Sequence, residues 1–348
     1  MKFYHELQLN QIGSKKIIKE SETLKQKLYH LIVYLFKILL TVGFCFLFVT
    51  IYSLLFSNEN SIIGVVVLLY LLVFRNAHFM IKTNQSLFLF ILFFAIMAVM
   101  PQIASHAHPL IGLIINLLSI STFVFLGCHE PGFYNQSTLV LCYLLIYGYP
   151  VEGVLYEKRV LGLIVGCIIV STIFYIKNRH QQHPETISSI IKAFDIHNPR
   201  TQWQLCQVIG VSLVVFVLEC LGIKRSMWGG IAAMSVILPA MPQMKKRVVG
   251  RVVGNIAGVM IFVILYYTLP HSIYTYIGIL GGIGVGLSAT YSWQAIFNTF
   301  GALAIASELY GLSHALSLRI ATNVFAVIFA LLFCVIFYKF IASSKRSI

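Results

Sequence analysis

Arg251 is the residue best suited to bind a carboxylate, because its planar guanidinium presents two parallel N–H donors. It opens the segment RVVGNIAG, in which Gly254 and Gly258 follow at helical spacing and Gly250 precedes. Glycines four apart share one helix face and let a neighbouring helix approach closely. At the start of a helix, unpaired amide groups would reinforce anion binding. The alternative is an arginine that extends to lipid headgroups and glycines that only pack.

Two further arginines begin similar segments. Arg159 opens RVLGLIVG, with Gly162 and Gly166 at the corresponding positions, and Arg319 opens RIATNVFA, with Thr322 and Ala326 there. We expect Arg159 and Arg319 to face the outer side of the membrane and Arg251 the inner side. An anion would then meet a cationic binding site on each side of the membrane. Successive three-helix units would then be inverted repeats, as in many secondary transporters.

Glu219 and Trp228 are the remaining candidates for a transport site. Glu219 lies in the apolar run VIGVSLVVFVLECLG, where an ionised side chain costs about 3 kcal/mol or more and usually has a function or a partner. It could carry a coupling proton, or it could pair with Lys224 or Arg225. Trp228 could stack on an aromatic ring, or it could belong to an interfacial aromatic belt.

The composition shows what kind of elements must position these residues. Of 348 residues, 59% are hydrophobic and 10% are charged, against about 25% charged residues in an average soluble domain. The apolar runs are continuous and near 20 residues, which favours membrane-spanning helices over a barrel. We therefore predict an all-α, polytopic transmembrane bundle of about twelve spans. They are placed at 31–56, 61–74, 84–104, 109–128, 135–149, 160–177, 204–222, 227–241, 252–269, 272–290, 294–309 and 318–341.

The distribution of cations predicts the orientation. Cytoplasmic loops of membrane proteins collect Lys and Arg, and the net charge of +14 concentrates on one side if both termini are cytoplasmic. The predicted organisation is a cytoplasmic leader (1–30), a six-span half (31–177), a cytoplasmic linker (178–203), a second six-span half (204–341) and a cytoplasmic tail (342–348). We expect a multi-pass protein of the plasma or inner membrane.

Other function classes lack their signatures in this chain. There is no HExxH, GxSxG or phosphate-loop motif, so we expect no enzyme activity and no cofactor. The seven cysteines form no CxxC pair, so we expect no metal site. The positive-inside bias explains the net charge without nucleic acid. The expected partners are small organic anions and membrane lipids, and association of two chains is left open.

The stretch around Arg251 resembles the fusaric acid resistance and aromatic acid exporter family. The matching positions are Trp228, Pro239, Arg251, Gly254 and Gly258. Arg319 matches the arginine that opens the last span of the family domain. The resemblance covers roughly 200–335 and implies export of aromatic or related organic carboxylates, coupled to an ion. A passive anion channel is the nearest alternative.

A second alternative comes from a different class. The basic residues Lys245, Lys246 and Arg247 could bind anionic lipids in a membrane scaffold or envelope-assembly factor that transports nothing. This reading predicts loss of function when those charges are removed.

Overall fold

The protein is helical throughout the part of the chain that its structure, a computed structural model, describes: residues 3–181, 183–270 and 273–344. The only other pairing in these residues is one isolated parallel bridge between Ile81 and Glu185. The predicted all-α class is thus confirmed. Most of the predicted tail, 345–348, lies outside the described residues.

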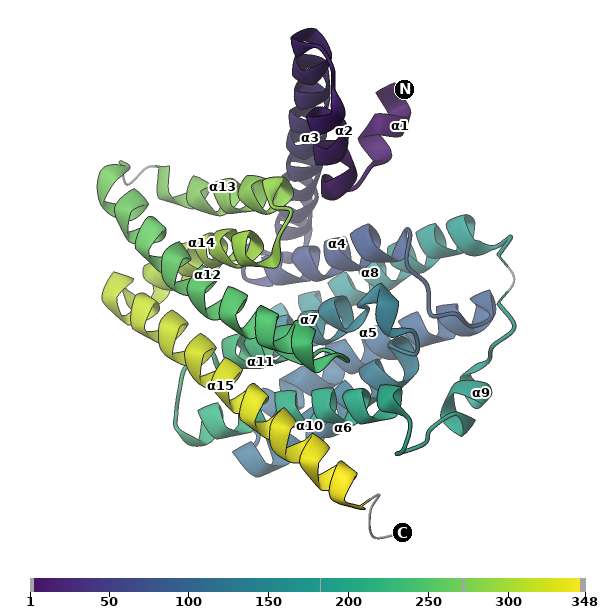
Figure 1. Ribbon diagram of the computed structural model, residues 1–348. Coiled ribbons are helices and arrows are strands. Elements are labelled where there is room, and N and C mark those ends of the chain that lie inside the picture. Colours follow the sequence, from purple (N-terminus) through teal and green to yellow (C-terminus); the bar gives the residue numbers. More distant parts are fainter. Residues whose placement is uncertain (1–2, 182, 271–272, 345–348) are drawn as a thin grey trace. The chain divides into compact units, whose positions relative to one another are not determined.

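Figure 1 shows the helices in chain order. The first are α1 (Phe3–Gln8), α2 (Gln11–Glu20), α3 (Leu24–Phe56), the 3-10 turn η1 (Asn58–Asn60), α4 (Ser61–Phe74), α5 (Thr83–His106), α6 (Pro109–Gly127), η2 (Pro131–Phe133), α7 (Gln136–Tyr147) and α8 (Val154–Asn178). They are followed by α9 (Ile187–Lys192), α10 (Pro199–Cys220), α11 (Ser226–Val236), α12 (Met241–Thr268), α13 (Tyr274–Leu287), α14 (Tyr291–Tyr310) and α15 (Leu312–Ser344).

Seven of these helices are long and apolar enough to cross a membrane: α3, α5, α6, α8, α10, α12 and α15. Each of the twelve predicted segments falls on a helix. However, α4, α7, α11 and α13 have 14, 12, 11 and 14 residues, against about 20 needed to span hydrocarbon. The chain is therefore a multi-pass membrane protein, and the count of twelve full spans is not confirmed.

Contacts divide the chain into two compact units. Unit 1 comprises residues 1–47 and 249–321, and unit 2 comprises 48–248 and 322–348. The boundaries fall inside α3, α12 and α15. This grouping follows contacts in space, whereas the predicted six-span halves follow order along the chain.

Unit 2 is built around α10 and the helices α4 to α8. α10 packs on α6 and α11, α11 also packs on α7, and α5 packs on α6, α7 and α8. Aromatic rings fill the space between α4 and α5, with Tyr70, Phe74 and Phe90 all buried and in mutual contact. The core of unit 2 is therefore a rigid support for the polar side chains described below.

In unit 1, α14 is the common partner of α12 and α13. α13 and α14 pack together and lie side by side in Figure 1. A Cβ atom at Gly254 of α12 would lie 2.7 Å from the Ser292 carbonyl oxygen, and one at Gly258 would lie 2.7 Å from that of Ile296. A Cβ at Gly250 would lie 2.7 Å from the hydroxyl of Ser292. This glycine face thus meets α14.

The glycines of α8 face other helices of unit 2. A Cβ at Gly162 would lie 3.3 Å from the Phe56 ring, and one at Gly166 would collide with Val67. Tyr52 donates a hydrogen bond of 3.3 Å to the Gly162 carbonyl. The absence of side chains on α8 therefore lets the 48–56 part of α3 and α4 approach it closely.

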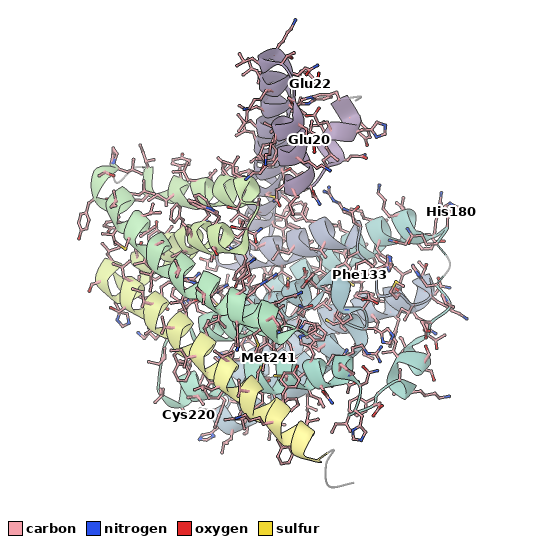
Figure 2. All side chains as sticks on the ribbon, in the orientation of Figure 1. Glu20, Glu22, Phe133, His180, Cys220 and Met241 are labelled. Carbon is pink, nitrogen blue, oxygen red and sulfur yellow. The ribbon has the colours of Figure 1, made fainter. Side chains whose placement is uncertain are left out.

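The helices that carry the three arginines begin earlier than predicted. α12 begins at Met241, labelled in Figure 2, so Arg251 lies ten positions, or about 15 Å, inside the helix. Pro242 is tolerated in a first turn, and the cations after it are good helix formers. Arg159 and Arg319 likewise lie inside α8 and α15. The expectation that helix-terminal amides assist Arg251 is therefore wrong.

Candidate functional site

The side chain of Arg251 is fixed between α12 and α14 in unit 1. Its Nη1 donates to the Tyr291 hydroxyl at 3.3 Å. One turn later, the amide of Asn255 donates to the Arg251 carbonyl at 3.0 Å and accepts a hydrogen bond of 3.1 Å from Thr299. The close helix approach at Gly254 brings these groups together. The result is a polar site between two helices whose other facing residues are small or apolar.

All three predicted arginines are buried. Arg159, Arg251 and Arg319 are 1%, 7% and 5% exposed. A side chain that extends to headgroups keeps its guanidinium accessible, so burial argues against that alternative. Arg251 and Arg319 belong to unit 1, and Arg159 belongs to unit 2.

Arg159 is held by neutral partners. Its Nε donates to the Asn60 side-chain oxygen at 3.0 Å, and its Nη1 donates to the Tyr149 carbonyl at 2.6 Å. Its Nη2 is buried and has no hydrogen-bond partner among the described residues. The guanidinium is thus fixed at two nitrogens while the third still has donor capacity.

Glu219 belongs to a polar cluster in unit 2. Its Oε1 accepts hydrogen bonds from Tyr147 of α7 and, at 3.1 Å, from Ser226 at the start of α11. Tyr143, one turn before Tyr147, donates to Asn116 of α6 at 2.7 Å. Two hydroxyl groups on neighbouring helices therefore donate to the same carboxylate oxygen of Glu219. Hydroxyl donors stabilise a carboxylate and can also carry its proton.

Trp228 is 3% exposed and lies in the first turn of α11. The next residues, Gly229 and Gly230, allow Leu218 and Val215 of α10 to approach α11 closely. Burial in unit 2 separates Trp228 from the exposed aromatic residues that form an interfacial belt.

A cavity of about 330 Å³ lies in unit 1. Lys15 of α2, Ser288, Thr290 and the aromatic rings of Trp293 and Phe297 line it. The two rings stack with centroids 6.2 Å apart, and Trp293 is 54% exposed. This cavity combines one cation with two aromatic rings.

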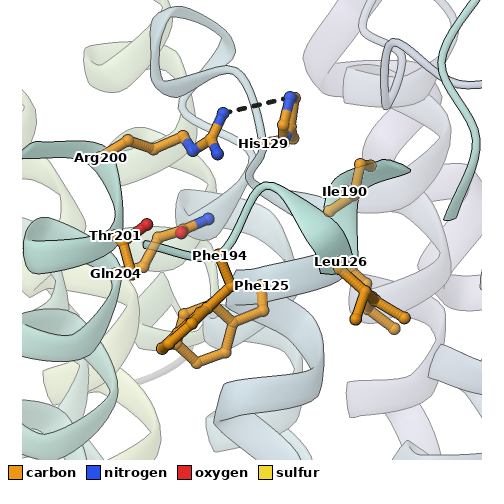
Figure 3. A pocket seen from close by; sticks show the side chains of 9 residues that line it. Phe125, Leu126, His129, Ile190, Phe194, Arg200, Thr201 and Gln204 are labelled. Atoms are coloured by element: carbon orange, nitrogen blue, oxygen red, sulfur yellow. Dashed lines mark hydrogen bonds between the residues drawn. The ribbon is translucent and has the colours of Figure 1, made fainter. Parts of the chain in front are cut away.

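A second cavity, of about 190 Å³, lies in unit 2 where the linker crosses the ends of α6 and α10 (Figure 3). Its polar wall carries Arg200, His129, Thr201 and Gln204, and its apolar wall carries Phe125, Leu126, Ile190, Ile191 and Phe194. The rings of Phe125 and Phe194 make an edge contact with centroids 5.5 Å apart. A ligand with one anionic end and one aromatic end would match both walls.

Arg200 and His129 are joined by a hydrogen bond between Nη1 and Nε2 at 3.2 Å, drawn as a dashed line in Figure 3. Burial and then the charge of Arg200 lower the pKa of His129. The imidazole is therefore neutral at pH 7 and accepts this hydrogen bond. Arg200 is left as the cation of the cavity, and the Thr201 hydroxyl, 1% exposed, has no hydrogen-bond partner among the described residues.

Sequence reasoning did not single out this second cavity. Its residues come from the end of α6, the linker and the first turn of α10, and no local pattern connects them. One available signal is the start NPRT, with Asn198 as a cap that accepts from the Arg200 amide. Another is the set of large apolar residues in a polar linker, including Phe194 and Ile196, which are about half exposed.

In the described residues, no group of three or more His, Cys, Asp or Glu side chains is arranged to hold a metal ion.

A family model described as fusaric acid resistance protein-like matches residues 212–333. The match includes Glu219, Trp228, Arg251 and Arg319, and it confirms the resemblance predicted from the sequence. The comparisons with curated proteins and with solved structures found no significant match. The chain is therefore a multi-pass membrane protein with a fusaric acid resistance-like region from the second half of α10 into α15.

Proposed function

We propose that this protein is a membrane transporter that exports organic anions, with aromatic carboxylates as the substrate class and a proton as the coupling ion. The observation that carries the proposal is the burial of Arg251 inside α12, a helix of bilayer length within the matched region. Ionisable residues inside membrane spans are costly and mark substrate or ion pathways. A guanidinium next to a tyrosine hydroxyl suits a carboxylate attached to a ring.

Each proposed role has a residue whose surroundings support it. Arg251 captures the anion from the cytoplasmic side, and Arg319 in unit 1 and Arg159 in unit 2 each act as an outer counterpart. Arg159 suits this role because its Nη2 still has donor capacity. Trp228 stacks on the ring of the substrate, and Glu219 carries the coupling proton in its cluster of hydroxyls.

The linker cavity supports the same substrate class independently of the arginine pattern. A carboxylate would meet Arg200 and the Thr201 hydroxyl, and a single ring would lie against Phe125 and Phe194. If the linker is cytoplasmic, as the distribution of cations predicts, this cavity is the site at which the exported anion first binds. Protein sites for small ligands commonly combine an apolar wall with a few polar groups that fix orientation.

The proposal is tested by efflux of radiolabelled benzoate from proteoliposomes that contain the wild type, Arg251→Ala or Arg251→Lys. Hydrogen bonds to charged groups contribute about 1.5–3 kcal/mol, so Arg251→Ala should slow efflux about tenfold or more. Arg251→Lys keeps the charge but loses the bidentate geometry, and it should fall between the two.

The matched control is Lys245→Ala with Lys246→Ala, which removes two exposed cations from the first turns of the same helix. We expect it to leave efflux unchanged. Wild-type efflux equal to that of empty liposomes, together with loss of cell function in the lysine variant, would instead favour the lipid-binding scaffold. Efflux that proceeds without any proton gradient or proton movement would favour a passive channel.

A further inference from the structure

Two histidines of unit 2 meet where the linker begins. His78 lies in the loop between α4 and α5, and His183 lies in the linker between α8 and α9. Their imidazole rings are tilted by 37° with centroids 4.5 Å apart. The ring of Phe133 in η2 contacts His78 edge-on, with centroids 4.7 Å apart. This histidine pair therefore joins the linker to a loop that is distant in the chain.

Each ring of the pair has one buried nitrogen, Nδ1 of His78 and Nε2 of His183, with no hydrogen-bond partner among the described residues. A neutral imidazole carries a lone pair on one of its nitrogens, whereas a protonated imidazole carries an N–H on both. A charged donor that is buried without an acceptor costs more than a neutral group. The surroundings of the pair therefore favour the neutral form of both rings.

Electrostatics act on His78 in the same direction. Burial and then the neighbouring His183 lower the pKa of His78 from its usual value of 6.5. A histidine whose pKa is lower in a contact than in water stabilises that contact above pH 6.5, and this contribution is lost as the pH falls below 6.5. Neither cause involves the other titratable groups on the surrounding elements, which are Arg75 and Lys82 in the loop of His78, His129, Glu130 and Tyr134 beside η2, and Arg179, His180 and Glu185 in the linker.

Hydrogen bonds next to the pair attach the linker to the start of α5. The Lys82 amide donates to the Glu185 carbonyl at 3.0 Å, and the Ile187 amide donates to the side-chain oxygen of Gln85 at 2.7 Å. Ile187 is the first residue of α9. The position of α9 therefore depends on a short segment that the histidine pair and these two bonds hold in place.

Residues 187–194, here called the lid, form much of the apolar wall of the linker cavity. Ile190 and Phe194 of the lid line the cavity and are labelled in Figure 3. At the far end of the lid, Arg200 donates to the Ala193 carbonyl at 3.1 Å. Phe194 is 53% exposed, so the lid buries little area of its own. Segments of this kind open at low free-energy cost, and the contacts at the two ends of the lid decide whether it stays closed.

We propose that His78 and His183 form a pH-sensitive latch, which holds the lid over the cavity while both rings are neutral and releases it when they take up protons. Two adjacent imidazolium rings repel each other, and their buried nitrogens would need water. Release moves Ile190 and Phe194 away from the cavity, which then loses much of its apolar wall. The latch follows from the contacts of the pair. That it releases a bound aromatic carboxylate in acid rests on the proposed function.

Hydrogen–deuterium exchange of the purified protein tests the latch, because the Lys82 and Ile187 amides are protected only while the linker is attached. Exchange is measured at about pH 7.5 and about pH 5.5, with times corrected for the intrinsic effect of pH on amide exchange. A histidine that must be neutral weakens its contact up to about tenfold one pH unit below its usual pKa. We therefore expect protection of both amides to fall about tenfold at the lower pH, while the amides of α10 stay protected. Unchanged protection of Lys82 and Ile187 overturns the latch.

Variants of the pair separate its titration from that of other groups. His78→Phe combined with His183→Phe keeps two rings in contact but takes up no proton, so both amides should stay protected at both pH values. His183→Lys carries a permanent charge and should leave them unprotected at both. The matched control is His180→Gln, an exposed linker residue whose imidazole accepts a hydrogen bond from Arg179 at 3.1 Å, and it should respond to pH like the wild type, as should His129→Gln.

Two results with these variants would overturn the latch. One is a phenylalanine variant that loses protection in acid as the wild type does. The other is a His183→Lys variant that stays protected at both pH values. If the two phenylalanine rings do not attach the linker at all, the lysine variant still decides.

Binding of radiolabelled benzoate to the purified protein tests what the latch does to the cavity. Benzoate stays ionised at both pH values. The wild type should bind it up to about tenfold more weakly at the lower pH, and the phenylalanine variant should not show this loss. Both proteins contain His129, so protonation of that residue does not contribute to the difference. The same pH dependence in both proteins overturns the release of ligand by the latch. If no benzoate binds at either pH, the proposed function fails, and amide exchange still decides the latch.

Discussion

At the scale of single residues, the contact between α12 and α14 depends on the absence of one methyl group. A Cβ at Gly254 would lie 2.7 Å from both the Ser292 carbonyl oxygen and the Ala295 Cβ. A backbone oxygen cannot move away without shifting the helix, so the strain would reach Arg251, which is held at the same contact.

We therefore expect Gly254→Ala to destabilise the protein by about 1–3 kcal/mol, the usual cost of overpacking, and to lower its thermal unfolding temperature in detergent. The control is Gly301→Ala in α14, where an added Cβ meets nothing within 4 Å. At this position alanine should stabilise the helix by about 0.5–1 kcal/mol, because the unfolded chain loses less backbone entropy on folding with alanine than with glycine. Equal unfolding temperatures for the two variants would contradict the glycine contact.

The sequence predicted which residues are special, but not what surrounds them. Arg251 and its glycines were recognisable because charge and helical spacing are local properties. Their partner helix was not predicted, since Ser292 and Ile296 offer no pattern that distinguishes α14 from α13. Arg200 was missed because its cavity depends on Phe125, distant in the chain.

At the scale of helices, hydropathy located the twelve helices α3–α8 and α10–α15 but not their full lengths. The apolar stretch of α12 starts near residue 252, whereas the helix starts at Met241, because a charged helical turn carries no hydropathy signal. Hydropathy likewise extends the eleventh helix, α11, to residue 241, whereas its 11 residues end at Val236, where the backbone becomes extended at Ile237. Hydropathy measures transfer to lipid, and hydrogen bonding along the backbone sets where a helix ends.

The packing of α10 on α15 in unit 2 can be tested by a cross-link. The thiols of Cys206 and Cys334 are fully buried with their sulfur atoms 2.7 Å apart, and a small movement brings them to bonding distance. Mild oxidation with copper phenanthroline in membranes should join the two peptides within one chain, as seen by mass spectrometry.

Two controls accompany this cross-link. Cys206→Ser should abolish it, and Cys142→Ser should not, because Cys142 is buried against the Val66 carbonyl on another side of unit 2. If oxidation left Cys206 and Cys334 unlinked in the wild type, α15 would not lie against α10 as described here.

At the scale of the whole molecule, function depends on which way the helices cross the membrane. An exporter must receive its substrate from the cytoplasm. The linker cavity at Arg200 can therefore be the first binding site only if α10 begins on the cytoplasmic side. The composition predicts this direction through the cations of the linker and of the first turns of α12. The end of α10, with Glu219 and Cys220, would then lie towards the outer side, where a driving proton would enter.

Cys220 gives a direct test of this direction. Among the seven cysteines it is the one whose side chain is exposed, and it ends α10, as Figure 2 shows. The other thiols are buried or half-buried, and only an ionised thiol in contact with water reacts readily with a maleimide. Intact cells should therefore be labelled by a membrane-impermeant maleimide at this position, and Cys220→Ser should remove the label. Labelling that needs permeabilised cells would place the end of α10 in the cytoplasm, and Arg200 would then lie on the wrong side to receive an exported anion.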